Sequence, residues 1–301
     1  MTEQPFNLIA GLTASDRGRN FVPHCVVVDD EAVSLRGPRA KTMDLGARRV
    51  GVSAIPRCWP RFAAALAVVL LAVAALARGA GQTLDVGKFS AAREDGPLPA
   101  GWRALEFKKI PHHTVYRLVR DGEAVVVEAK SESSASGLVR PIRIDAKEYP
   151  IVEWRWKVMN LIAKADVRRK SGDDYPARIY ITFEHDPARL GFLERLKFEA
   201  AKLVYGEYPP IAALDYIWEA RLAPGSIVPN PYSSRVQMIV VESGPERLGR
   251  WIDERRDVVA DYRQAFGEDP PPISGVAIMT DSDNTGESAT AYYGDIVFQR
   301  K

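Results

Sequence analysis

The chain has 301 residues, with 41 Lys and Arg against 39 Asp and Glu and a formal net charge of +2 at pH 7. Residues 1–77 hold nine of the basic and six of the acidic residues, which leaves 32 basic and 33 acidic residues in 78–301. This near-neutral balance excludes binding driven by the charge of a nucleic-acid backbone, which needs an excess of Lys and Arg.

A basic flank followed by an apolar run marks residues 57–77. Arg57 and Arg61 precede the sixteen-residue run Phe62–Ala77, and small residues end it just before Arg78. As a helix the run would cover about 24 Å, less than the roughly 30 Å of a bilayer core. This layout predicts a signal peptide that is cleaved from an exported, periplasmic product, with an uncleaved signal anchor as the alternative. We expect membrane contact only through this segment.

Residues 1–56 precede the predicted signal, although secretory signals begin within the first few residues of a chain. They contain no sustained apolar period. We therefore expect 1–56 to be an upstream extension together with the basic start of the signal, with translation beginning at Met43 or near Val50. A cytoplasmic leader on a membrane-anchored protein is the alternative.

Residues 78–301 are long enough for a single domain with a substantial core. Both cysteines, Cys25 and Cys58, lie upstream of this part. The exported product is therefore expected to be free of cysteine, with neither a disulfide nor a thiol nucleophile.

Strict alternation predicts two strands with well-defined faces. In Val152–Val158, Val and Trp side chains share one face, while Glu153, Arg155 and Lys157 share the other. Arg178–Glu184 alternates in the same way, with an Ile and Phe face opposite a polar one. A period of two residues is typical of a strand that is buried on one side.

Seven further segments have the composition of strands, and Asp121-Gly122 separates two of them in the manner of a tight hairpin. These segments are Trp102–Phe107, Thr114–Val119, Ala124–Ala129, Tyr216–Arg221, Val236–Val241, Ser274–Met279 and Ala291–Phe298. Short strands broken by Gly, Pro and Asp turns predict a fold dominated by β-structure, a jelly-roll-like antiparallel β-sandwich over residues 78–301.

Two segments with helical spacing, Phe192–Val204 and Asp253–Phe266, predict accessory helices at an edge or open end of the sandwich. Gly267 is placed to end the second helix. Asp257 and Asp261 are four residues apart, where like charges repel mildly on a helix. We expect at least one of them to bind a neighbouring loop or an Arg.

An ordered set of short motifs covers most of residues 78–301. The motifs are Leu98–Trp102, Glu153–Lys157, Gly172–Asp174, Ala177–Tyr180, Arg256-Asp257, Asp261-Tyr262, Met279–Gly286 and Tyr293–Ile296. Together they resemble a bacterial exported family catalogued as domain of unknown function 3047. The resemblance implies an exported, β-rich single domain, and it supplies no catalytic residue.

The loop Asp281–Gly286 directly follows a predicted strand and gathers oxygen-bearing side chains. Asp281, Asp283 and Asn284 provide the hard oxygen ligands that calcium prefers, although the spacing is not that of an EF-hand. We therefore predict Asp281 and Asp283 as metal ligands and calcium as the one cofactor that the sequence suggests. The alternative is a polar turn, in which the side chains cap their own backbone and Gly286 adopts a positive φ.

A second acidic pair, Asp173 and Asp174, precedes the strand that begins at Arg178. If the strand ends adjoin, these carboxylates would face Asp281 and Asp283, and such charges require a cation or an arginine among them. Arg178 is the nearest candidate. We therefore count Asp173, Asp174 and Arg178 with the Asp281 loop as candidate ligand-binding residues.

Polar faces of the two alternating strands suggest a glycan site. Tyr180 shares the polar face of its strand with Arg178, and Glu153, Arg155 and Lys157 form the polar face of theirs. If both faces lay on one concave sheet, they would form a groove that binds a glycan or another polar small ligand. An ordinary solvated face is the alternative.

Two functions from different classes remain open. The first is a non-catalytic cell-envelope module that binds a polar ligand such as a glycan, supported by calcium. The second is an exported hydrolase or lyase that acts on envelope polysaccharide through the clustered Asp residues. The sequence contains no recognisable nucleophile motif, which favours the binding module.

Overall fold

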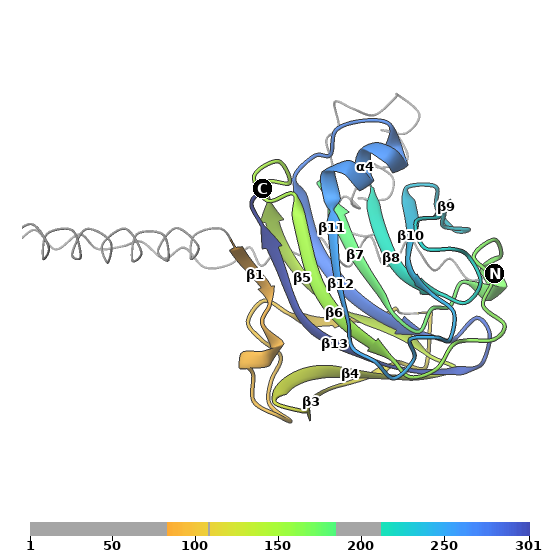
Figure 1. Ribbon diagram of the computed structural model, residues 1–301. Helices are drawn as coiled ribbons and strands as arrows, with labels where there is room; N and C mark the ends of the chain where they lie inside the picture. The colour runs from red at the N-terminus through yellow and green to blue at the C-terminus, as the bar shows by residue number, and fades with distance from the viewer. Residues whose placement is uncertain (1–82, 108, 185–211) are drawn as a thin grey trace, which may run out of the picture. The chain divides into compact units, whose positions relative to one another are not determined.

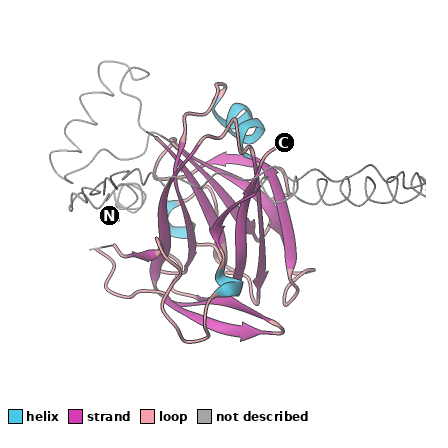
Figure 2. Ribbon diagram, turned by 90° about the vertical axis from the view of Figure 1, so that its left-hand side faces the viewer, coloured by secondary structure: helices cyan, strands magenta, loops and turns pink. Residues whose placement is uncertain are grey.

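The computed structural model describes residues 83–107, 109–184 and 212–301, which form two β-sheets packed as a sandwich (Figures 1 and 2). The six-stranded sheet contains, in order, β11 (Ile252–Asp257), β6 (Ile151–Val158), β13 (Ser288–Gln299), β4 (Ala124–Glu132) and β3 (Val115–Asp121), with β1 (Thr83–Gly87) also paired to β13. The seven-stranded sheet contains β2 (Arg103–Leu105), β5 (Ala135–Ile144), β12 (Ile273–Asp281), β7 (Arg178–Phe183), β8 (Ala213–Glu219), β10 (Val236–Ser243) and β9 (Ile227–Pro229).

Consecutive strands cross from one sheet to the other, because β4 and β6 belong to the six-stranded sheet whereas β5 and β7 belong to the seven-stranded one. This confirms the predicted β-sandwich. Among the described strands, all pairs are antiparallel except β8 and β10. The parallel pair is possible because residues 220–235 between the two strands are long enough to return the chain to the same end of the sheet.

The core lies between the sheets and is built from the apolar faces that alternation predicts. Trp154 and Trp156 of β6 are 3% and 0% exposed, and their rings meet edge to face at 5.5 Å. Ile179 and Ile181 of β7 are fully buried in the same cluster. The predicted hairpin is also present, since Asp121 pairs with Ala124 around a positive-φ glycine.

Strand β5 was missed because its sequence carries breaker and charged residues. Pro141 lies where the pairing with β12 shifts, so its missing N–H falls at an irregularity in the ladder. Arg140 and Arg143 interrupt the apolar pattern of the strand. The short strands β1 and β9 are likewise not marked by alternation.

The predicted helix Asp253–Phe266 is wrong in its first five residues. Residues 252–257 pair with β6 as strand β11, and the helix α4 spans only Val258–Phe266. Asp257 is the N-cap and accepts hydrogen bonds from two backbone N–H groups of the first turn. Gly267 ends the helix with φ of 76°, as predicted.

At least one of Asp257 and Asp261 was expected to bind a neighbouring loop or an Arg, and this is confirmed. Asp261 binds Arg256 and receives the hydroxyl of Tyr216, while Asp257 caps α4 and pairs with Lys301. The strand β11 was mistaken for the start of the helix because its Asp, Glu and Arg residues show no apolar alternation, as is possible for a strand at the edge of a sheet. The structure also contains the 3₁₀ turns η1 (Phe89–Ala91) and η2 (Lys170–Gly172).

Several predictions lie outside the described residues: the extension 1–56, the signal peptide 57–77 and the helix Phe192–Val204. Within the described ranges, no helix has the length and apolar character needed to cross a membrane.

The core assignment predicts the effect of truncating Trp154. Because this indole is buried against Trp156 and Tyr216, Trp154→Ala should lower the free energy of unfolding by about 3–5 kcal/mol. Met159, which is 45% exposed, offers a control, and Met159→Ala should change stability by less than about 0.5 kcal/mol. Denaturant unfolding measures both, and a Trp154→Ala variant as stable as the wild type would contradict the assigned face.

Candidate functional site

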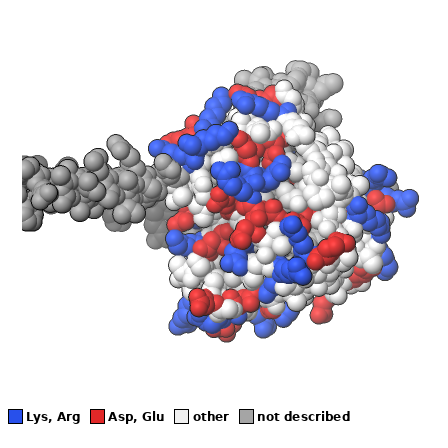
Figure 3. All heavy atoms as spheres, in the orientation of Figure 1, with Lys and Arg blue, Asp and Glu red and all other residues white. Residues whose placement is uncertain are grey.

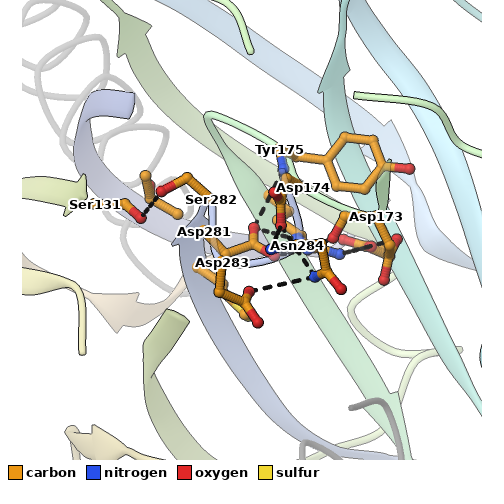
Figure 4. Close-up of polar contacts among 12 residues, drawn as sticks. Ser131, Asp173, Asp174, Tyr175, Asp281, Ser282, Asp283 and Asn284 are labelled. Carbon is orange, nitrogen blue, oxygen red and sulfur yellow. Dashed lines mark hydrogen bonds and ion pairs between the residues drawn. The ribbon is translucent and has the colours of Figure 1, made fainter. Parts of the chain in front are cut away.

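The candidate site forms where β12 ends and β7 begins. The two strands are antiparallel neighbours, with Met279 paired to Arg178, so the loop after β12 adjoins the loop before β7. Asp281, the last residue of β12, and Asp283 in the loop after it therefore lie beside Asp174 from the loop before β7, as Figure 4 shows. The strand ends therefore adjoin, which is the condition under which the sequence placed these acidic residues together.

Arg178 lies at the centre of this site and is 2% exposed. Its guanidinium binds both carboxylate oxygens of Asp281, with Nε 2.9 Å from Oδ1. The same group donates to the backbone carbonyl of Asp173 and to the hydroxyl of Tyr180. Within the described residues, Arg178 is the only Lys or Arg side chain that is buried, so it is the main positive charge available to the site.

Asp281 is 1% exposed and also accepts a hydrogen bond from the backbone N–H of Tyr175 at 3.3 Å. Burial raises the pKa of this carboxyl, and the Arg178 guanidinium opposes that rise by favouring the charged form. In Arg178 the effects have the opposite sign. Burial lowers the pKa of the guanidinium, but Asp281 and the other neighbours raise it by more, so the pKa lies above its ordinary value. The geometry is that of a paired carboxylate and guanidinium.

Asp173 approaches the guanidinium from the other side. Its carboxylate lies 3.7 Å from Nη1 of Arg178 and receives the amide of Asn230 at 3.1 Å on each oxygen. Burial raises the pKa of Asp173 to about 6, against the lowering effect of Arg178 and Asn230. The Tyr175 ring lies over the guanidinium, 4.5 Å from ring centroid to Cζ.

Asp174 is fully buried and shapes the Asp281–Gly286 loop. One of its oxygens receives the backbone N–H and the side-chain amide of Asn284, and the other receives the N–H of Thr285 at 2.7 Å. Gly286 has φ of 70° and donates to the carbonyl of Ser282. The polar turn considered from the sequence is therefore present, and a carboxylate from a second loop completes it.

Ser282 ties this loop to the other sheet. Its hydroxyl lies 2.6 Å from that of Ser131 in β4, and its N–H donates to the carbonyl of Ser134. Figure 4 shows the contact between Ser131 and Ser282, and both residues are buried. The loop backbone is thus fixed on both sides, which keeps Asp281 and Asp283 in place.

Three carboxylates form an arrangement that suits a hard cation. One oxygen each of Asp174, Asp281 and Asp283 lies within 4.8 Å of the others. Two ligands at 2.3–2.6 Å from a calcium ion can be separated by up to about 5 Å, so this spacing fits. Burial raises the pKa of Asp283 to about 6, and the neighbouring Asp174 adds to the rise. A bound cation would favour the charged form of Asp283 and so lower its pKa.

Asp215 of β8 belongs to the same cluster and was not predicted from the sequence. It is fully buried, 3.7 Å from Nη1 of Arg178, and neither carboxylate oxygen has a hydrogen-bond partner among the described residues. Burial raises its pKa to about 7, against the opposing effect of Arg178. The signal that could have revealed it is a single carboxylate within the apolar run 212–218.

Tyr180 does not line the predicted glycan groove. It is 3% exposed, and its strand β7 belongs to the seven-stranded sheet, whereas Glu153, Arg155 and Lys157 belong to β6 of the six-stranded sheet. Since the apolar faces of both strands point into the shared core, their polar faces lie on opposite outer sides of the sandwich. The single groove formed by both faces was therefore a wrong prediction.

Comparison with known proteins identifies a family and a distant structural likeness. The model of the family described as "Protein of unknown function (DUF3047)" matches residues 100–297. No curated protein matches the chain. Among solved structures, the chain is similar to the carbohydrate recognition domain of Emp47p, with 10% identity and a TM-score of 0.34 over 73% of this chain and 98% of that one. That TM-score is too low to transfer a function.

Asp215 predicts a pH-dependent stability. Its pKa of about 7 in the folded state exceeds the ordinary value of about 3.9 in an unfolded chain, so the unfolded state releases the proton first. The contribution of Asp215 to the free energy of unfolding should therefore be most favourable below about pH 4. It should decline between about pH 4 and pH 7, as the carboxyl loses its proton first in the unfolded and then in the folded state. Asp215→Asn, which mimics the protonated form, should stabilise the protein by about 2–4 kcal/mol at pH 8, with the gain disappearing near pH 4.

Denaturant unfolding in the presence of a chelator, at several pH values, measures this difference. Asp85→Asn is the matched control, since the Asp85 side chain is 48% exposed and pairs with Lys88 on the surface. Equal effects of Asp215→Asn at pH 5 and pH 8 would contradict the assigned titration.

Proposed function

Because the chain belongs to the DUF3047 family, which carries no assigned activity, we propose a function from the residues of the site. The protein is a cell-envelope binding module in which Asp174, Asp281 and Asp283 hold a divalent cation of the calcium type. The cation stabilises the loop Asp281–Gly286 and helps the domain to bind a polar ligand such as a glycan.

The imbalance of charge in the site is the observation that supports this proposal most. Five aspartates, at positions 173, 174, 215, 281 and 283, surround one buried guanidinium. Burial raises the pKa values of four of them, at positions 173, 215, 281 and 283, although Arg178 opposes the rise, and a bound proton or cation would stabilise such carboxylates. The carboxylates of Asp174, Asp281 and Asp283 have the spacing of cation ligands.

The coordination would be incomplete with protein oxygens alone. Calcium takes six to eight oxygen ligands, and three carboxylates supply only part of that shell. Asp283 and Asn284 are partly exposed, so the remaining positions open toward solvent. Water or the hydroxyl groups of a polar ligand would complete the shell from that side.

Export is part of the proposal and rests on the basic and apolar layout of residues 57–77. The product would begin at Arg78 and reside in the periplasm. N-terminal sequencing of the exported protein tests this, because a product that retains residues before Met43 would contradict both cleavage and the later start.

The polysaccharide hydrolase or lyase is less well supported by the same residues. The pKa values of about 6 and 7 at Asp173 and Asp215 would suit a general acid. However, these side chains are 5% and 0% exposed, whereas a general acid must reach the bond that it protonates. Burial therefore favours a binding role.

Thermal unfolding with calcium and with chelator tests the cation. A cation at a hundredfold excess over its Kd stabilises the fold by about 2.7 kcal/mol, which should raise the Tm by about 5–10 °C for a domain of this size. Asp283→Asn removes one ionised ligand from a partly exposed position and should abolish most of this rise.

Asp85→Asn serves again as the matched control and should retain the full response. If calcium and chelator give the same Tm for the wild-type protein, the loop Asp281–Gly286 is only a polar turn and the cation proposal is wrong.

A further inference from the structure

The outer surface of the six-stranded sheet contains a hollow that is separate from the aspartate cluster. Its volume is about 440 Å³. It is lined by residues of β6, β11 and β13: Glu153, Trp154, Arg155, Asp253, Glu254, Arg255, Asp295 and Val297. Alternation along β6 and β11 places the charged side chains of Arg155, Asp253 and Arg255 on this outer face, away from the core.

An irregularity in β13 creates space for Arg155. The pairing of β13 with β6 shifts between Tyr293 and Ile296, and Gly294 lies within this interval. A Cβ atom at Gly294 would be only 2.4 Å from Cγ of Arg155. The missing side chain therefore allows Arg155 to lie flat across β13.

Arg155 and Asp253 are direct neighbours across β6 and β11, yet they form no ion pair. Side chains at such positions have Cβ atoms about 5 Å apart, and opposite charges there normally attract. The Arg155 guanidinium instead stacks on Trp251, 4.3 Å from the ring centroid. The guanidinium makes no hydrogen bond with the described residues, and its two Nη groups, unlike Nε, are not buried. Asp253 is exposed and also has no partner among the described residues.

Three of the surrounding charged side chains are held by hydrogen bonds within the domain. Arg255 and Glu153, the next outward pair along the same two strands, bind each other at 2.9 Å, and Glu153 also receives the amide of Gln299. Asp295 receives the backbone N–H of Ser90 at 2.8 Å. The hollow thus presents the Nη donors of Arg155 and the carboxylate of Asp253 without partners, while the unpartnered Oε1 of Glu254 is buried beneath them.

We propose that this hollow binds a neutral sugar through two adjacent hydroxyl groups. Asp253 accepts a hydrogen bond from one hydroxyl, and Arg155 donates to the oxygen of the other. This inference rests on the proposed binding function and assigns it a site and a ligand class.

The mixed lining favours a neutral ligand over a charged one. A hydroxyl both donates and accepts, so a diol matches an acceptor and a donor that lie side by side. A ligand carboxylate would face the four acidic side chains of the lining, and a ligand cation would face Arg155 and Arg255. Basic and acidic side chains are also interspersed on the face of the domain shown in Figure 3, which presents no large field of one sign.

A panel of immobilised oligosaccharides tests the ligand class with the full-length exported protein. The panel pairs neutral hexose oligosaccharides with matched chains that carry a carboxylate on each unit. We expect binding to neutral members and weaker binding to their carboxylated counterparts. No binding to any neutral member, or stronger binding to the carboxylated chains, would overturn the inference.

Calorimetric titration of the strongest neutral probe then tests the site. Asp253→Ala changes an exposed side chain and should weaken binding about tenfold or more, because a hydrogen bond to a charged acceptor is lost. Arg155→Lys keeps the charge but loses the planar stack on Trp251, and it should also weaken binding. Asp85→Ala is the matched control and should bind as the wild type does.

Asp283→Asn separates this inference from the cation proposal. If Asp283→Asn abolishes binding of the probe while Asp253→Ala leaves it unchanged, the ligand binds at the aspartate cluster and the hollow is not its site. If Asp253→Ala weakens binding in protein that shows no response to calcium, the hollow binds the sugar and the cation proposal fails alone.

Discussion

The buried pair of Arg178 and Asp281 is the interaction on which the site depends. It joins neighbouring strands β7 and β12, and the same guanidinium reaches the backbone of Asp173. Removing one partner of a buried pair is costly, because the other charge then remains buried without compensation. Here Arg178 also faces Asp173 and Asp215, so its loss would leave several carboxylates without their shared counter-charge.

The sandwich explains why this polar cluster can be buried without disturbing the core. The apolar faces of β6 and β7 meet between the sheets, and Arg178 and Asp215 point to the other side of the seven-stranded sheet. Tyr175 packs over that side, with its hydroxyl donating to the sulfur of Met238 at 3.3 Å. The cluster therefore has a dry setting in which an uncompensated charge shifts pKa values strongly.

The two proposed sites differ in how their acidic and basic side chains are arranged. In the cluster, carboxylates outnumber the one guanidinium and lie close together, which favours a cation. In the hollow, Arg155 and Asp253 are neighbours that form no ion pair, because Arg155 stacks on Trp251, and this favours a ligand with both donors and acceptors. The hollow includes exposed side chains such as Asp253, whereas Arg178 and Asp215 of the cluster are buried.

Strong local patterns allowed much of the fold to be predicted from the sequence. Strict alternation identified β6 and β7 and their buried faces, and the Asp121-Gly122 turn identified the β3–β4 hairpin. β5 was missed because Pro141 and its arginines hide the pattern, and β11 was mistaken for helix because edge-strand charges leave no apolar period.

The sequence indicated most of the acidic residues of the site but not which strands would pair. Asp173 and Asp174 were expected to face the Asp281 loop if the strand ends adjoined. The pairing of β7 with β12 meets this condition, so that Asp174 lies beside the loop and Asp173 beside Arg178. Asp215 was missed because only the pairing of β8 with β7 brings it to Arg178. Tyr180 was placed on the wrong surface because alternation identifies the faces of a strand but not the sheet to which it belongs.

A crystal structure of the protein grown with a lanthanide in place of calcium tests the central claim most directly. An anomalous peak should appear among Asp174, Asp281 and Asp283, with carboxylate oxygens at about 2.3–2.6 Å from the ion. The Arg178–Asp281 pair should remain intact beside it. Crystals that show no peak there, while all three carboxylates keep only their present hydrogen bonds, would contradict the account.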